Sequence, residues 1–173
     1  MRRFAVIVAL GGLLSVLGGV ATASAALAGT GTTQIHLATT SLNFIPDKCV
    51  NPPNVDPLDP SCIVAQVTVV GGASSNLSTG KGTFQATLLV DHSPGGNCNI
   101  VDENDVFTFA NGTILIHSHH EDCAIHALRI DTTFQVTGGT GDFAGTTGGS
   151  GHEFSAVNNS PVSPIIFNGT ITF

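Results

Sequence analysis

The chain of 173 residues has no tryptophan and no tyrosine, and only 10% of its residues are charged. Sugar-binding sites commonly stack their ligands on these two ring types, so their absence argues against a carbohydrate-binding function. Basic residues are also scarce, because five Lys and Arg are set against 12 Asp and Glu. A chain of this composition has no basic patch with which to bind nucleic acid or an anionic membrane.

The N-terminal residues predict a secretory signal peptide. Two arginines precede an apolar run over 4–20, and Ala-Ser-Ala at 23–25 is a small-residue cleavage motif. A transmembrane anchor is the alternative, but the run is short for a bilayer and contains four glycines. We therefore expect removal of residues 1–25 and secretion of a single domain, 26–173. That domain has three basic and 12 acidic residues, a formal charge of −9.

The four cysteines agree with export. Cys49, Cys62, Cys98 and Cys123 are an even number in a chain expected to reach an oxidising compartment. No C-x-x-C spacing is present, which favours disulfides over a zinc site. Of the three possible pairings we favour Cys49–Cys62, because it closes a proline-rich loop that has little else to order it. Cys98–Cys123 then follows by elimination.

Alternating apolar residues and β-branched runs predict about eight strands and no helix after the signal peptide. Residues 91–104 are predicted as a polar loop, and Gly71-Gly72 as the end of a strand. The His-rich segment 117–126 is predicted to interrupt the extended pattern. The expected strands are 32–44, 63–70, 81–90, 106–109, 113–116, 127–137, 152–157 and 165–173.

These strands suit a closed structure. An even number of antiparallel strands with frequent glycine can close into a barrel, which removes exposed edges. The chain ends in a strand that can pair with the first. The predicted fold class is therefore all-β, a closed antiparallel eight-stranded β-barrel. The side chains predicted to fill its interior include Phe84, Phe107, Phe109, Phe134, Phe167 and Phe173.

Two turn signals are prominent. Asn111-Gly112 between two apolar runs predicts a tight hairpin, because these residues accept positive φ angles. Gly139-x-Gly141-x-x-Ala144 matches a dinucleotide fingerprint in its letters, but Thr-Thr-Gly-Gly-Ser-Gly follows and cannot continue the helix that holds the pyrophosphate. We therefore interpret 133–151 as a glycine-rich hairpin, with Phe143 as a plug at one end of the core.

The same stretch carries a family resemblance. FQVTGGTGDFAGTTG at 134–148, preceded by FANGTI at 109–114, resembles the allene oxide cyclase and dirigent barrel superfamily, in particular its small exported bacterial members. The resemblance covers about 105–173. It implies a closed eight-stranded antiparallel barrel with an apolar cavity, and it leaves a homo-oligomer open, since plant members are often dimers or trimers. The plant enzymes cyclise or couple apolar molecules, but their polar residues do not map onto this chain, so the catalytic residues are unknown.

The histidine-rich segment is the clearest chemical feature. His117 and His119 share one face of a strand, and His126 and Asp131 follow closely. Two imidazoles on one face with a third ligand suit Zn²⁺, Cu²⁺ or Fe²⁺, so His117, His119 and His126 form a candidate metal site. The alternative is a solvated polar strand end beside a disulfide loop. Apart from such a metal ion, no cofactor is expected.

Side chains for acid–base chemistry are few. Of the neighbours His152 and Glu153, one points into the barrel and one out, and His152 is the inward one if Phe154 is buried. No nucleophile elbow and no free thiol are expected. The candidates for a general acid or base are His36, His92, His117, His126, Asp131, His152 and Glu153.

Three hypotheses about function follow. The first is a secreted barrel that binds a small apolar molecule, with isomerase or cyclase chemistry implied only by the resemblance. The second is a metal-binding protein or enzyme that uses the histidines of 117–126. The third is an extracellular structural or interaction module. None of them involves nucleic acid, or a membrane once the signal peptide has been removed.

Overall fold

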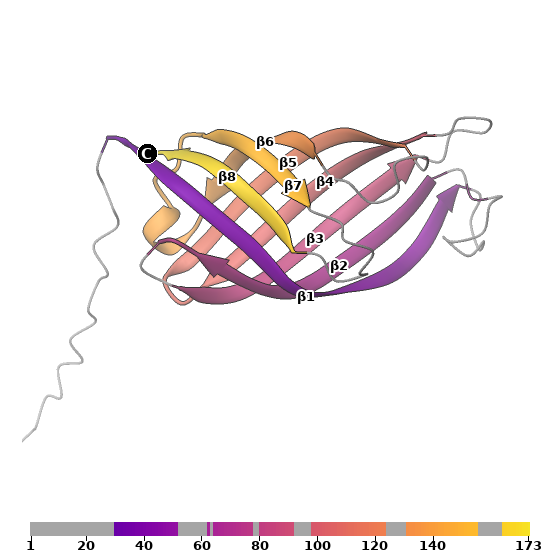
Figure 1. Ribbon diagram of the computed structural model, residues 1–173, viewed down its shortest axis with the longest axis horizontal. Coiled ribbons are helices and arrows are strands. Elements are labelled where there is room, and N and C mark those ends of the chain that lie inside the picture. Colours follow the sequence, from indigo (N-terminus) through magenta and orange to yellow (C-terminus); the bar gives the residue numbers. More distant parts are fainter. Residues whose placement is uncertain are drawn as a thin grey trace, which may run out of the picture.

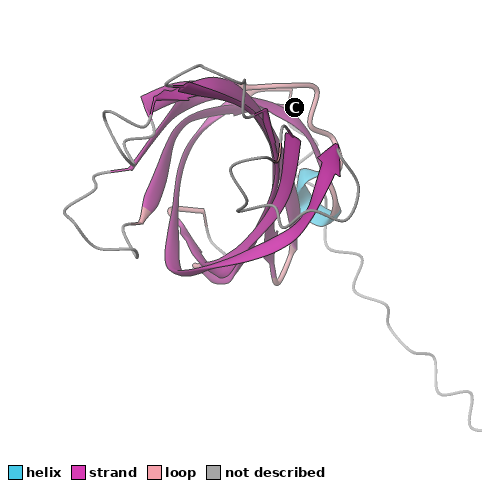
Figure 2. Cartoon of the chain, turned by 90° about the vertical axis from the view of Figure 1, so that its right-hand side faces the viewer, coloured by secondary structure: helices cyan, strands magenta, loops and turns pink. Residues whose placement is uncertain are grey.

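The computed structural model describes residues 30–51, 62, 64–77, 80–91, 98–123, 131–155 and 164–173. Eight antiparallel strands pair in chain order and form a closed barrel, in which β8 pairs with β1 (Figures 1 and 2). The predicted all-β barrel is therefore confirmed, including its closure by the last strand. Residues 1–25, the expected signal peptide, lie outside the described residues. In the described part, no helix is long and apolar enough to span a membrane.

The elements follow one another without a crossover. A single-turn 3-10 helix, η2, lies between the sixth and seventh strands. The strands are β1 (Thr32–Asn51), β2 (Val64–Ser75), β3 (Lys81–Asp91), β4 (Cys98–Phe109), β5 (Gly112–Cys123), β6 (Asp131–Gly139), β7 (Ser150–Ser155) and β8 (Ile165–Thr172), and η2 is Gly141–Phe143.

Several strands are longer than the hydrophobic pattern predicted. β4 begins at Cys98, so most of the predicted polar loop 91–104 is strand, and β5 continues through the histidines to Cys123. β2 passes through Gly71 and Gly72. The predictions of these boundaries were wrong because they relied on apolar alternation. A barrel strand also extends where its inward residues are polar, since its backbone is paired on both sides.

The barrel has two distinct ends. The disulfide end is where β1, β3, β5 and β7 finish, and the glycine-turn end contains η2. Phe143 of η2 is 2% exposed and packs in the core, as predicted for the plug. Gly141 has a φ of +61°, and a Cβ there would lie 2.0 Å from the carbonyl oxygen of Asn111. Only glycine permits this close approach of the two turns.

The β4–β5 hairpin differs in detail from the prediction. The turn is Ala110-Asn111, and Gly112 is already the first residue of β5, paired with Phe109. Among the described residues, Ser41 is the non-glycine residue with positive φ, so Asn111 does not adopt the left-handed angle we expected. Gly112 has a φ of +151°, and its missing side chain makes room for the carbonyl oxygen of Thr140.

Phenylalanine rings fill the half of the barrel nearer the glycine-turn end. The ring centroids of Phe84 and Phe107 are 5.0 Å apart, those of Phe107 and Phe167 are 5.1 Å apart, and those of Phe134 and Phe167 are 5.6 Å apart. These four side chains are at most 1% exposed. The predicted inward face of the aromatic residues is therefore confirmed, and their rings pack against one another in this half of the interior.

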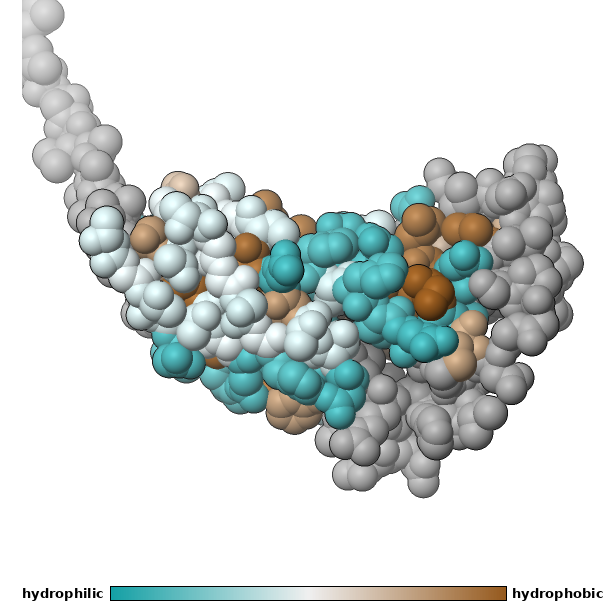
Figure 3. Space-filling model, turned by 90° about the horizontal axis from the view of Figure 1, so that it is seen from above, coloured by the Kyte–Doolittle hydropathy of each residue, from teal (hydrophilic) through white to brown (hydrophobic). Residues whose placement is uncertain are grey.

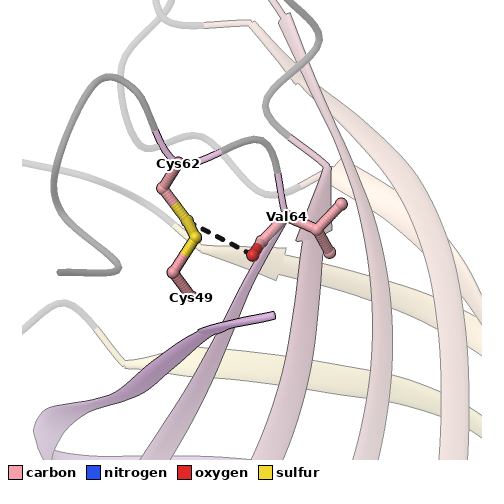
Figure 4. The surroundings of a disulfide bond; sticks show 3 residues. All are labelled: Cys49, Cys62 and Val64. Carbon is pink, nitrogen blue, oxygen red and sulfur yellow. Dashed lines mark hydrogen bonds between the residues drawn. A yellow bond between two sulfur atoms is a disulfide. The ribbon is translucent and has the colours of Figure 1, made fainter. Parts of the chain in front are cut away.

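The Cys49–Cys62 disulfide is confirmed, with a Cα–Cα distance of 5.8 Å (Figure 4). The sulfur of Cys62 lies 3.2 Å from the carbonyl oxygen of Val64, a close contact, since a disulfide sulfur has no proton to donate. Cys98 is also disulfide-bonded and lies opposite Cys123 in the β4–β5 register, the arrangement that the predicted second pair requires. Disulfides indicate an oxidising environment.

Candidate functional site

Three carboxyl side chains point into the barrel. Glu103 and Asp105 come from β4, and Glu153 comes from β7. They are 2%, 1% and 0% exposed. On β4 the two acids occupy the same face as the buried Phe107, because every second residue of a strand points inward. Fully buried acidic residues are rare unless they have a partner or a function, so this group, the carboxyl cluster, is the candidate functional site.

The carboxyl cluster lies directly on the aromatic packing. Asp105 is two residues from Phe107 along β4, and Glu153 is opposite Phe167 in the β7–β8 register. Glu103 is one step closer to the disulfide end and lies opposite Ser118 of β5. The phenylalanines therefore form an apolar floor beneath the three acids.

On the other side of the cluster, the inner wall is only partly covered. Val67 and Leu88 are partly buried against the core, and Val90 packs against the Cys49–Cys62 disulfide. Phe44 lies opposite the buried Val69, which places it on the inner face, yet it is 56% exposed. We call Phe44, Val67, Leu88 and Val90 the mouth residues.

The carboxyl cluster lacks hydrogen-bond donors. Both carboxyl oxygens of Asp105, both of Glu153 and Oε2 of Glu103 are buried without a hydrogen-bond partner, and so is the hydroxyl of Ser118. By contrast, the buried Thr39 is satisfied, because its hydroxyl accepts a hydrogen bond from the backbone N–H of Ile165 at 2.8 Å. Buried polar groups normally have partners, so these orphaned oxygens need an explanation.

Burial raises the pKa of all three acids. It is the largest cause for Glu153, whose pKa rises to about 9 with a further contribution from the negative charge of Glu103. Burial also raises the pKa of Glu103 to about 7, while contact with Asp105 lowers it. The pKa of Asp105 is raised well above its ordinary range by burial and by its two acidic neighbours.

These shifts define what the cluster can do at neutral pH. Glu153 remains protonated and can donate a hydrogen bond or a proton, whereas Glu103 is partly ionised and can accept one. Ser118 lies close enough to Glu153 to lower its pKa slightly, although neither oxygen of Glu153 makes a hydrogen bond of good geometry. Neighbouring carboxyl groups with separated pKa values form a set suited to acid–base catalysis.

His117 and His119, two of the predicted metal ligands, lie on the opposite face of β5, outside the barrel. Asp102 is near both imidazoles: its carboxylate is 3.9 Å from Nδ1 of His117 and 3.6 Å from Nδ1 of His119. Within the described residues, no group of three or more His, Cys, Asp or Glu is placed to hold a metal ion. His126 lies outside the described residues, so the site formed by His117, His119 and His126 stays a prediction.

The remaining acid–base candidates divide between the two faces. Glu153 points inward, whereas His152 points outward and its Nε2 lies 3.2 Å from a carboxylate oxygen of Asp131. Phe154 therefore does not point into the barrel. His152 was expected to point inward only if Phe154 did, so His152 is not an inward residue. His36 is exposed on β1, and His92 lies outside the described residues.

A groove of about 440 Å³ lies on the outer wall over β1 to β4. Its lining includes Asn43, Thr83, Gln85 and Thr108 and contains no titratable side chain, so it offers no acid–base chemistry. The view in Figure 3 shows an exterior that is largely polar, with small and separated apolar patches.

Of the cluster, only Glu153 was among the sequence-based candidates, and Glu103 and Asp105 were missed. A signal for them exists in the sequence. Phe107 and Phe109 point inward, and every second residue of a strand points to the same side. Counting back from Phe107 in steps of two residues therefore puts Asp105, Glu103 and Val101 on the inner face. The acidic composition of 102–105 concealed this alternation and favoured a loop.

Comparison with known proteins identifies no family. No protein-family model and no curated protein matches the sequence. Among solved structures, the chain is similar to one described as pyocyanin demethylase, with 12% sequence identity, a TM-score of 0.43 and coverage of 80% of this chain and 99% of that one. Such a distant similarity does not identify a function, and the resemblance to allene oxide cyclases and dirigent proteins is not confirmed.

Proposed function

We propose that this protein is a secreted barrel that binds a small, largely apolar molecule at the mouth residues, with its polar end against the carboxyl cluster. The observation that carries the proposal is the burial of Glu103, Asp105 and Glu153 between an aromatic floor and a half-exposed apolar wall. Burying unpaired carboxyl groups costs free energy, and proteins retain such groups mainly where they act on a ligand.

The chemistry that the cluster supports best is proton transfer without a cofactor. In an isomerisation, ionised Glu103 would remove a proton from a carbon next to a carbonyl group while protonated Glu153 donates a hydrogen bond to the carbonyl oxygen. Glu103 would then return the proton to another carbon of the same molecule. Nothing is oxidised, and the enzyme ends in its starting protonation state. This is the isomerase or cyclase class that the sequence resemblance implies.

Binding at the mouth can be tested with a matched pair of substitutions. Leu88 faces inward opposite Glu103, whereas Leu89 faces outward and is 46% exposed. Leu88→Trp should place a larger side chain over the cluster and weaken binding of the neutral lipophilic dye Nile red at least fivefold, whereas Leu89→Trp should leave binding unchanged. Fluorescence titration measures both. Equal dye affinity in both variants and the wild type would rule out binding at the mouth.

Secretion is part of this proposal. It is supported by the Cys49–Cys62 disulfide and by the N-terminal sequence pattern. The mature protein recovered from the culture medium should begin at Ala26 when its mass is measured. Recovery of the full-length chain from the cells alone would contradict secretion.

A metal ion bound outside the barrel is a second candidate. The observation in its favour is the position of Asp102, whose carboxylate lies within 4 Å of the imidazoles of both His117 and His119. Calorimetric titration with Zn²⁺ should show one site that His119→Ala abolishes. His36→Ala, which removes an exposed histidine from β1, is the matched control. Identical titrations for all three proteins would exclude this site.

A further inference from the structure

The interior of the barrel has more hydrogen-bond acceptors than donors. Five carboxyl oxygens from three acids are buried without partners, and the unpartnered hydroxyl of Ser118 points to the same place from β5. Glu103 brings no donor when it is ionised, so even with both other acids protonated the cluster has more acceptor lone pairs than O–H donors. A ligand that fills this region favourably must therefore bring donors of its own.

No Lys or Arg is among the buried residues of the part that the structure describes. Lys81, the basic side chain whose exposure the structure describes, is exposed at the glycine-turn end. The other titratable group on the inner face is His120 of β5, which lies opposite Val101, one step beyond Glu103 toward the disulfide end, and makes an interaction of its own. An ionised carboxylate in this interior is stabilised by a cation brought close to it.

We infer that the ligand carries a single positive charge, as a primary ammonium or a protonated nitrogen base on an apolar body, and that this group binds against Glu103. The inference rests on the proposed function, because it names the class of molecule that the mouth would take. An ammonium or N–H cation supplies both the donors and the charge that the cluster lacks.

The position of Glu103 explains why the charged group goes there. Of the three acids, Glu103 is the one next to the mouth, because it lies opposite the partly buried Leu88, whereas Asp105 lies opposite the fully buried Ala86. An apolar body resting on Leu88 and Val67 would therefore place its polar end at Oε2 of Glu103, an oxygen without a partner.

Three probes with one ring system test the sign of the charge. They are 2-naphthylmethylammonium, 2-naphthylmethanol and 2-naphthoate, which are cationic, neutral and anionic at pH 8. Isothermal titration of the purified protein at pH 8 should show the cation binding at least tenfold more tightly than the alcohol, and the anion more weakly than both. Because the cation favours ionised carboxylates, its binding should also release protons, measured by repeating the titration in buffers of different ionisation enthalpy.

Two substitutions locate the effect. Glu103→Gln should reduce the tenfold preference for the cation to less than threefold, with the fold checked by thermal unfolding. Glu121→Gln removes a carboxylate from the exposed outer face of β5 and should retain the preference, which controls for long-range electrostatics. If Glu103→Gln does not fold, Glu153→Gln replaces it, since loss of either acid removes acceptors from the same cluster.

The outcomes separate the two proposals. If the alcohol binds as tightly as the cation, or if Glu121→Gln abolishes the preference as fully as Glu103→Gln, the cation class is wrong while binding at the mouth survives. If none of the three probes binds and Nile red does not bind either, the proposed function fails, and this inference fails with it.

Discussion

Glu153 and Phe167 lie opposite each other on β7 and β8, and both side chains are fully buried. A carboxyl group in direct cross-strand register with an aromatic ring has little access to solvent, which is the main cause of its raised pKa. This pair marks the boundary between the packed aromatic half of the barrel and the half that contains the carboxyl cluster. Several measurable properties depend on that boundary.

Replacing Glu153 by Gln is expected to stabilise the protein at neutral and alkaline pH. The pKa of Glu153 rises from 4.5 to about 9 on folding. Between these values the folded state holds the proton and the unfolded state does not, so stability present below pH 4.5 is lost as the pH rises toward 9. At about 1.4 kcal/mol per pKa unit, even half of this displacement corresponds to about 3 kcal/mol.

Denaturant unfolding at pH 5, 7 and 9 tests this prediction. The wild-type free energy of unfolding should fall with rising pH, and the profile of Glu153→Gln should be flatter. Glu121→Gln, on the exposed outer face, should follow the wild-type profile. Parallel profiles for the wild type and Glu153→Gln would show that Glu153 is not protonated in the folded protein.

A methyl group at Gly151 should be poorly tolerated. A Cβ there would lie 2.2 Å from the carbonyl oxygen of Asn168 and 2.5 Å from the ring of Phe134. Gly151→Ala is expected to lower the free energy of unfolding by about 1–3 kcal/mol, the usual cost of overpacking. At Gly138, the Cβ would meet only Leu115, at 3.7 Å, so Gly138→Ala should be neutral or slightly stabilising. Equal effects in thermal unfolding would contradict this account.

Phe143 and Phe44 should differ sharply in their contribution to stability. Phe143 is 2% exposed at the glycine-turn end, and Phe44 is 56% exposed at the mouth. Phe143→Ala leaves a cavity and should cost about 3–5 kcal/mol. Phe44→Ala should cost less than about 1 kcal/mol, because most of the ring is already in water. A large loss for Phe44→Ala in denaturant unfolding would mean that the ring is covered in solution.

Removing the Cys49–Cys62 disulfide should lower the free energy of unfolding, because the bond restricts the conformations of the unfolded chain. Cys49 and Cys62 are 13 residues apart, and closing a loop of that size contributes about 3 kcal/mol. The double variant Cys49→Ser with Cys62→Ser should lose about this amount in denaturant unfolding. An unchanged midpoint would indicate that the segment between the two cysteines is equally restricted without the bond.

The barrel itself could be predicted from the chain. Alternation in residues 165–173 and around Phe84 and Phe134 identifies strands, and the glycines of 138–151 identify a reversal. The last strand pairs with the first, as an even antiparallel count allows. The lengths of β4 and β5 could not be predicted in the same way, because their inward residues include Glu103 and Ser118, and polar residues at buried positions break the hydrophobic pattern that reveals a strand.

The sequence by itself determined the fold class, the Cys49–Cys62 pair and the plug at Phe143, because backbone preferences and apolar periodicity are local properties. Only the tertiary structure decided that Glu103, Asp105 and Glu153 meet. Glu103 and Asp105 come from β4 and Glu153 from β7, two strands that are not neighbours in the sheet, and closure of the barrel brings them together across the interior. Their raised pKa values arise from this shared burial, a property of the closed barrel and of no single segment of the chain.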